Sequence, residues 1–185
     1  LLMEKKTIVK RTQLEHYMDV GSGETPQWAR MGDGWSKFDD ATSAQTESTK
    51  YINMDTESTD TTSYKTAYNF ECDLMYSDPT IKKVYEIYKN RKVLGDCLVK
   101  ILTVEKFNAV SGGGYVARME TCAVAPSGTS ENNNKMKLSG AFNGLGDPVI
   151  GKFAPATSGG GGTFTADTAE AASANSESKA VNTEE

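Results

Sequence analysis

Residues 64–77 alternate between apolar or aromatic side chains and mostly polar ones over their whole length. Successive side chains of a β-strand point to opposite faces of the sheet, so this pattern predicts a long strand with one packed and one solvated face. Such strands occur in antiparallel sheets, because one face of such a sheet can meet water. The packed side comprises Tyr64, Thr66, Tyr68, Phe70, Cys72, Leu74 and Tyr76, and the other side comprises Lys65, Ala67, Asn69, Glu71, Asp73, Met75 and Ser77.

One helix is predicted, over residues 78–91. Asp78 is a residue type that favours the N-cap position, and Pro79 suits the first helical position. The apolar residues that follow recur at helical spacing, which gives the helix one packed face. Together with apolar residues of the predicted strands, they form the candidate core, which comprises Trp28, Tyr68, Phe70, Leu74, Ile81, Val84, Tyr85, Tyr88, Ile101, Leu138 and Phe142.

Short apolar or alternating segments, separated by turns rich in Gly, Pro and Asn, predict further strands. The expected fold class is therefore mainly β (α+β): an antiparallel β-sandwich or partial barrel with one flanking α-helix, a long projecting loop and extended terminal arms. We expect an N-terminal arm over residues 1–25, a β domain over 26–155, and a Gly-rich linker with an acidic flexible tail over 156–185. The further strands are expected at 26–34, 96–107, 115–125, 135–143, 149–154 and 163–165, with a loop at 127–134 and a turn at 144–148.

The segment from Asp39 to Ser63 is dominated by Ser, Thr and acidic residues. One interpretation is a solvated loop, or a hairpin with a polar tip. The other is a projecting arm that becomes ordered by docking on a neighbouring molecule. Long loops in compact domains are uncommon and tend to be functional or disordered, so this segment is a candidate contact region.

Composition argues against several functional classes. The net charge is −5, most of it comes from the last residues of the chain, and no basic patch indicates nucleic-acid binding. The three cysteines, Cys72, Cys97 and Cys122, form no metal-binding motif and are expected to be buried thiols. The single histidine, His16, lacks the partners of a catalytic triad and is expected at the surface. We therefore expect no enzyme activity, no metal, no cofactor and no membrane-spanning segment.

The order of these features resembles the tail tube proteins (major tail proteins) of long-tailed, non-contractile, siphovirus-type bacteriophages. The resemblance covers residues 26–155. The segments that carry it are Trp35-Ser36-Lys37-Phe38 before the Ser/Thr-rich stretch, Lys50-Tyr51-Ile52-Asn53, the strand from Tyr64 to Glu71, Asp78-Pro79 at the start of the helix, and the closing strands from Lys135 to Phe153 with Gly140, Phe142, Gly146 and Gly151.

The resemblance implies a virion structural protein. It implies a β-sandwich flanked by a helix, homohexameric rings, and a helical stack of rings that forms a hollow conduit for genome ejection. The implied partners are identical copies of the chain, the tape measure, tail terminator and distal tail proteins, and double-stranded DNA that passes through the lumen without specific binding. The implied location is the tail of the virion, after assembly in the host bacterial cytoplasm, with no membrane insertion by this chain.

Two sets of residues follow from this resemblance. A neutral or acidic channel lining lets DNA slide, because a basic lining would hold its phosphates. The candidate lumen-facing residues are Lys65, Asn69, Glu71 and Asp73. The long loop is implied to make contacts between rings or subunits, and its candidate residues are Thr46, Glu47, Lys50, Tyr51, Asp55, Glu57 and Asp60.

Two alternatives stay open. The inner tube protein of a contractile tail or injection machine shares the expected fold. A β-sandwich module that binds a host surface or a carbohydrate would expose aromatic residues on loops, whereas the aromatic residues here lie mostly in predicted strands and on the predicted helix.

Overall fold

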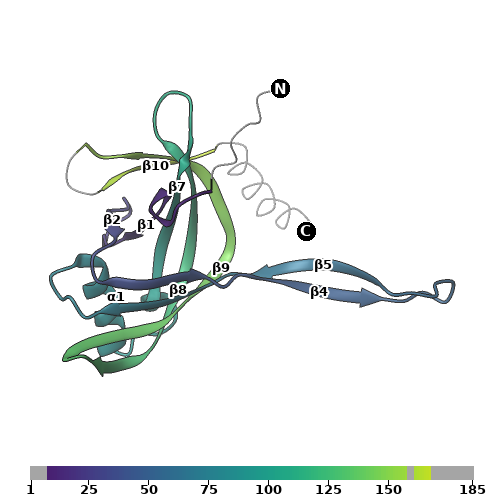
Figure 1. Cartoon of the computed structure of the whole chain (residues 1–185), viewed down its shortest axis with the longest axis horizontal. Helices are drawn as coiled ribbons and strands as arrows, with labels where there is room; N and C mark the ends of the chain where they lie inside the picture. The colour runs from purple at the N-terminus through teal and green to yellow at the C-terminus, as the bar shows by residue number, and fades with distance from the viewer. Residues whose placement is uncertain (1–7, 158–160, 168–185) are drawn as a thin grey trace, which may run out of the picture. The chain divides into compact units, whose positions relative to one another are not determined.

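The computed structural model describes residues 8–157 and 161–167 (Figure 1). These residues lie mostly in antiparallel strands, with one α-helix in the described part of the chain, so the prediction of a mainly β fold is confirmed. They divide into two compact units. Unit 1 takes residues 8–32, 100–120, 147–157 and 161–167, and unit 2 takes Asp33–Val99 and Thr121–Gly146. Three strands, β7 (Leu98–Ala109), β8 (Tyr115–Asn132) and β9 (Lys135–Pro155), contribute to both units.

Unit 1 is built around β1, which lies between β2 and β7 in the sheet. Tyr17 on β1 is directly opposite Leu102 on β7, so both side chains point into one core. Strand β10 pairs with the last part of β9 and sets Phe164 opposite Phe153. The remaining elements are the 3-10 helix Arg11–Gln13, β1 (Leu14–Asp19), β2 (Trp28–Met31) and β10 (Gly162–Ala166), and the core comprises Tyr17, Trp28, Leu102, Val104, Ala117 and Phe153.

Unit 2 has an aromatic core on one face of β6, which lies between β3 and β9. Antiparallel register sets Phe38 opposite Phe70, and Tyr68 opposite Phe142. The Phe38 and Tyr68 rings stack at 5.1 Å between centroids, and Phe70 and Phe142 lie 4.8 Å apart. Helix α1 packs against this face, where Trp35 Nε1 donates to Thr80 Oγ1 at 2.9 Å. The bounds are β3 (Trp35–Asp40), β6 (Ala67–Asp73), α1 (Pro79–Lys89) and the 3-10 helix Leu94–Cys97.

The start of α1 follows from its first residues. Asp78 caps the helix by accepting hydrogen bonds from the backbone N–H groups of Thr80 at 2.8 Å and Ile81 at 3.0 Å. The packed face differs from the sequence prediction, because Ile87 is buried whereas Tyr85 and Tyr88 are half-buried. A tyrosine can keep its hydroxyl in water while its ring covers apolar surface, but isoleucine has no polar atom to expose.

The long strand predicted over residues 64–77 is not one strand. Strand β5 ends at Lys65, Thr66 interrupts the ladder, and β6 ends at Asp73. Tyr64 and Tyr76 are 71% and 53% exposed, and Leu74, in the turn after β6, is only half-buried. The break arises because the chain changes pairing partners there: β5 pairs with β4, whereas β6 pairs with β3 and β9.

Other predicted boundaries also move. Strand β8 continues through the predicted loop at 127–134 as far as Asn132, and β9 runs without a break through the predicted turn at 144–148. The connecting turn shrinks to Asn133 and Asn134, which both have positive φ, at 49° and 60°. Two such residues give the tight turn that suits the twist of paired strands. Strand β1 lies within the predicted N-terminal arm, and β10 lies within the predicted linker. Of the predicted terminal segments, residues 1–7 and 168–185 lie outside the described part.

The remaining candidate core residues are buried, those of the strands at alternating positions and those of α1 at helical spacing. Trp28, Tyr68, Phe70, Ile81, Val84, Ile101, Leu138 and Phe142 are all buried. The sequence did not predict that position 140 requires glycine. Gly140 lies directly opposite Phe70. A Cβ at this position would lie 2.6 Å from the Ala125 carbonyl oxygen and 2.7 Å from the Pro126 Cα, so only glycine lets these backbone segments approach.

Candidate functional site

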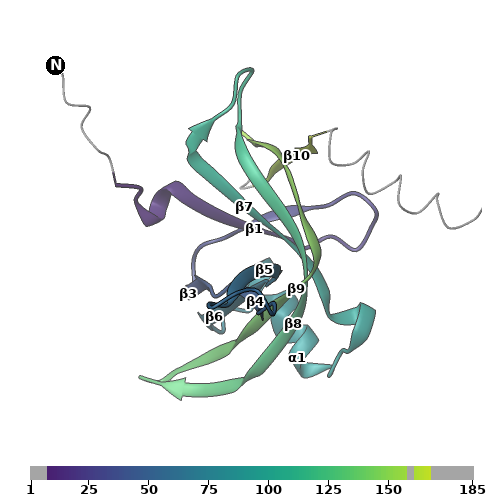
Figure 2. The same cartoon turned by 90° about the vertical axis from the view of Figure 1, so that its right-hand side faces the viewer.

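An exposed two-stranded ribbon projects from unit 2. It consists of β4 (Ser43–Thr49) and β5 (Ser58–Lys65), which continue the β3–β6 hairpin outward (Figure 1), and Figure 2 looks along it from its tip. The Asp39–Ser63 segment is thus a hairpin rather than an irregular loop, and every residue of both ribbon strands is exposed. The predicted contact residues all lie here and are exposed: Thr46 and Glu47 on β4, Asp60 on β5, and Lys50, Tyr51, Asp55 and Glu57 in the ribbon tip, residues 50–57.

The ribbon has little of its own to hold it together. Its cross-strand contacts are polar, such as the hydrogen bond between Ser48 Oγ and Thr59 Oγ1 at 2.9 Å. Glu47 is directly opposite Asp60, and like charges in this position destabilise a strand pair. A two-stranded hairpin without a packed face is marginally stable in water. The ribbon therefore presents two open edges and two polar faces that a neighbouring molecule can cover.

A second candidate surface is the face of β6 that points away from the aromatic core. Asn69, Glu71 and Asp73, three of the four candidate lumen-facing residues, lie on this face at every second position of β6. Lys65 is not beside them on this strand, because it is the last residue of β5, beyond the break at Thr66. Neighbouring strands add residues to the same face, and its charged members are Lys37, Asp39, Glu71, Asp73, Lys135 and Lys137.

The charges on this face are balanced, three lysines against three carboxylates. Lys137 Nζ forms an ion pair with Glu71 Oε1, and Lys135 Nζ lies 3.4 Å from Asp73 Oδ2. The hydrogen bond from Lys137 holds the pKa of the Glu71 carboxyl below its usual range, and the same bond raises the pKa of the Lys137 ammonium. Exposed pairs of this kind add little to stability, so their main effect is a surface without net charge.

The described residues contain no group of three or more His, Cys, Asp or Glu side chains placed to hold a metal ion. His16 is half-buried and its Nδ1 lies 3.2 Å from Thr103 Oγ1, an interaction between two strands of unit 1. The three cysteines are buried, and burial raises the pKa of the Cys72 thiol to about 12. None of the described helices is of a length and hydropathy suited to crossing a bilayer.

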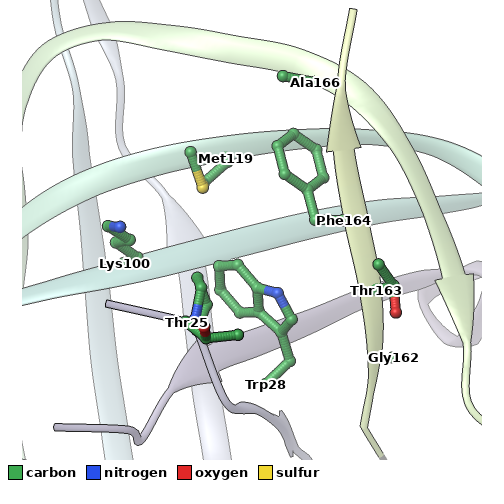
Figure 3. A pocket seen from close by; sticks show the side chains of 9 residues that line it. Thr25, Trp28, Lys100, Met119, Gly162, Thr163, Phe164 and Ala166 are labelled. Carbon is green, nitrogen blue, oxygen red and sulfur yellow. The ribbon is translucent and has the colours of Figure 1, made fainter. Parts of the chain in front are cut away.

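A pocket in unit 1 was not found from the sequence. It has a volume of about 350 Å³ and opens between the edge strands β2 and β10 (Figure 3). From the sequence, a strand was expected at 163–165 but could not be paired with β9 beside β2, and Trp28 was assigned to the closed core, so the pocket was not predicted. The residues that line it are Thr25, Pro26, Trp28, Lys100, Met119, Gly162, Thr163, Phe164 and Ala166.

Comparison with known proteins identifies the fold. No family model matches the sequence, and no curated protein matches it. A chain of the SPP1 tail tube is similar to this one with a TM-score of 0.60 and 10% identity, over 77% of this chain and 78% of that chain. A chain of the anti-feeding prophage baseplate, from a six-fold symmetrised structure, is similar with a TM-score of 0.50 and 6% identity, over 80% of this chain and 97% of that chain. The fold expected from the resemblance to tail tube proteins is therefore confirmed.

Proposed function

We propose that this chain is the structural subunit of a phage tail tube. In this function, identical copies form hexameric rings, and the rings stack into the hollow conduit through which the genome reaches the host. The observation that carries the proposal is the ribbon. The chain is similar in fold to the SPP1 tail tube, and a regular hairpin projects from this fold with every residue of its two strands exposed.

The physics of the ribbon favours self-assembly. The two ribbon strands have open edges, and the Glu47 and Asp60 carboxylates lie opposite each other across them. The ribbon gains stability when a neighbouring copy supplies hydrogen-bond partners to the edges and positive charge to the carboxylates. Contact between the ribbon and a different surface of the next copy is heterologous. Such contacts close into rings or continue as open stacks, which is the geometry that a tube requires.

The balanced face of β6 suits the channel. Phosphate groups are held by surfaces with excess positive charge, through the release of counterions. Here Lys135 and Lys137 are paired with Asp73 and Glu71, so the face offers DNA no net charge. We propose that this face, with Asn69, lines the lumen and lets double-stranded DNA pass without specific binding.

The proposed role is structural. We propose no enzymatic activity and no cofactor. The proposed location is the tail of the virion, after assembly in the host cytoplasm, and the proposed partners beyond identical copies are the tape measure, tail terminator and distal tail proteins.

A shortened ribbon tests this proposal. Replacing residues 46–62 by Asn-Gly places a two-residue turn between Gln45 and Ser63, which are partners in the native register. We expect the purified wild-type chain to form rings or hollow tubes in negative-stain electron microscopy, and the shortened chain to stay monomeric with a native circular dichroism spectrum. Ser48→Ala is the matched control, because it removes one ribbon hydrogen bond, keeps the length and should still give tubes.

A wild-type chain that remains monomeric at millimolar concentration would contradict the proposal. Normal tubes from the shortened chain would leave the tube function standing and would show that the ribbon is not an assembly element.

One observation favours a second candidate, the inner tube protein of a contractile tail or injection machine. The similar chain of the anti-feeding prophage baseplate comes from a six-fold symmetrised structure, so a similar fold also occurs in an assembly other than a phage tail tube. Co-purification with a protein that forms an outer sheath would distinguish this candidate from a non-contractile tail tube.

A further inference from the structure

The pocket of unit 1 is an uncovered end of that unit's own core. Leu102 and Val104 belong to the core, and Lys100 lies on the same face of β7 because side chains alternate along a strand. Met119 likewise continues the core face of Ala117 on β8. The core therefore reaches the surface at this end.

The walls of the pocket are mainly aromatic and apolar. Figure 3 shows the Trp28 and Phe164 rings and the Met119 side chain gathered around the cavity. Met119 and Phe164 are only partly buried, although they pack against the core. The two edge strands come close here, since a Cβ on Gly161 would lie 3.0 Å from the Trp28 carbonyl oxygen. The pocket thus has fixed walls and an opening to solvent, as sites for apolar groups do.

Among the described residues that line the pocket, Lys100 is the only charged one. It is half-buried, and no carboxylate among residues 8–157 and 161–167 forms an ion pair with it. An occupant that combines apolar side chains with a nearby carboxylate would match both the walls and this ammonium group.

The ribbon tip of unit 2 has this combination. The backbone N–H of Met54 donates to the Tyr51 carbonyl oxygen at 3.0 Å, so Tyr51 to Met54 form a turn with Ile52 at its apex. Ile52 is fully exposed and its neighbour Tyr51 is 64% exposed, so two adjacent large apolar side chains are available for contact at the end of the ribbon. Asp55 and Glu57 follow within the tip and carry its negative charge.

We propose that the pocket receives the ribbon tip of a second copy of this chain. Tyr51 and Ile52 pack between Trp28 and Phe164, and Asp55 pairs with Lys100. This inference rests on the proposed self-assembly and adds to it the anchor residues and their receptor. A small apolar anchor in a preformed pocket, surrounded by polar contacts, is the usual energetic centre of a protein interface.

Cross-linking tests the contact directly. In the wild-type background, Ile52→Cys and Thr163→Cys place thiols on the tip apex and on the exposed rim of the pocket, while the native cysteines are buried. We expect mild oxidation of assembled tubes to give a ladder of disulfide-linked chains on non-reducing gels. Ser48→Cys with Thr163→Cys is the matched control and should give no ladder, because Ser48 lies along the ribbon and away from its tip.

Substitutions test the energetics. Burial of an isoleucine side chain corresponds to about a ten-fold or larger change in affinity, so Ile52→Asp should raise the critical concentration for assembly by at least about ten-fold. Asn53→Asp adds the same charge at the neighbouring position and should change it less. Lys100→Glu and Asp55→Lys should each weaken assembly, and the two together should restore it.

The outcomes separate this inference from the proposed function. Tubes that form normally from Ile52→Asp chains, or that give no ladder, would overturn the pocket contact and leave the tube function standing. A photo-cross-linker attached at Thr163→Cys should capture residues 50–54 of another copy by mass spectrometry. Capture of a different segment or of another protein would also overturn the contact, and a wild-type chain that forms no assembly would overturn both proposals.

Discussion

Truncation of one aromatic side chain, Phe142→Ala, should remove a large part of the stability of unit 2. The Phe142 ring is fully buried, and its centroid lies 4.8 Å from that of Phe70, 5.8 Å from that of Phe38 and 6.3 Å from that of Trp35. A buried aromatic side chain removes about 150–250 Å² from water, which at about 25 cal/mol per Å² corresponds to roughly 4–6 kcal/mol. Alanine keeps a small part of this area, so we expect a loss of about 3–5 kcal/mol in the free energy of unfolding.

Urea denaturation of the dilute monomer measures this loss without a contribution from assembly. Tryptophan fluorescence reports on this cluster through Trp35 and on unit 1 through Trp28, and far-UV circular dichroism reports on the strands. With a slope of about 2 kcal/mol per M urea, the midpoint should fall by about 2 M. Tyr64→Ala is the matched control: it also removes a ring from the alternating stretch, but Tyr64 is 71% exposed, so the expected change is within about 0.5 kcal/mol.

The two variants together test the packing argument. A Phe142→Ala midpoint within about 0.3 M of the wild type would refute the inference that this ring is central to unit 2, given the same slope. An equal loss from Tyr64→Ala would show that the ribbon side of the break at Thr66 is packed in solution.

Three further predictions use the same monomer. Gly140→Ala should lower stability by about 1–3 kcal/mol in urea, because its Cβ would meet the Ala125 carbonyl oxygen at 2.6 Å; an unchanged midpoint would contradict this close approach. Asp78→Ala should cost about 1 kcal/mol in thermal unfolding, whereas Asp78→Asn, which keeps a capping oxygen, should cost less. Burial raises the pKa of Cys72 from 9.0 and that of Tyr17 from 10.0, each to about 12, so the fold favours both protonated forms. The stability they contribute is complete below about pH 9 and is lost as the pH rises towards 12, and Cys72→Ala should delay the start of this loss in a urea series across that range.

The sequence determined the features that depend on neighbours along the chain. Alternation around Tyr68, Phe70 and Cys72 separated a packed face from a polar one, and the structure buries these three side chains. Asp78 and Pro79 located the start of α1 because capping uses only the adjacent backbone. The polar composition of residues 39–63 indicated a segment that projects into solvent, and the ribbon does so.

Features that depend on distant segments did not follow from the sequence. The period of two is the same whichever strand a segment pairs with, so nothing at Thr66 announced that β5 pairs with β4 whereas β6 pairs with β3 and β9. The pairing of Lys137 with Glu71 depends on the register between strands far apart in the chain.

The candidate site likewise combines features that follow from local sequence with features that depend on distant segments. Local patterns were enough to assign which side chains alternate, where the helix starts and which residues project into solvent, because these are properties of the backbone and its nearest side chains. The pairing of the strands, the balanced charge of the β6 face and the pocket between β2 and β10 became visible only in the folded chain. Strand pairing and core closure are set by contacts between segments distant in sequence, and no local pattern encodes the free energies of those contacts.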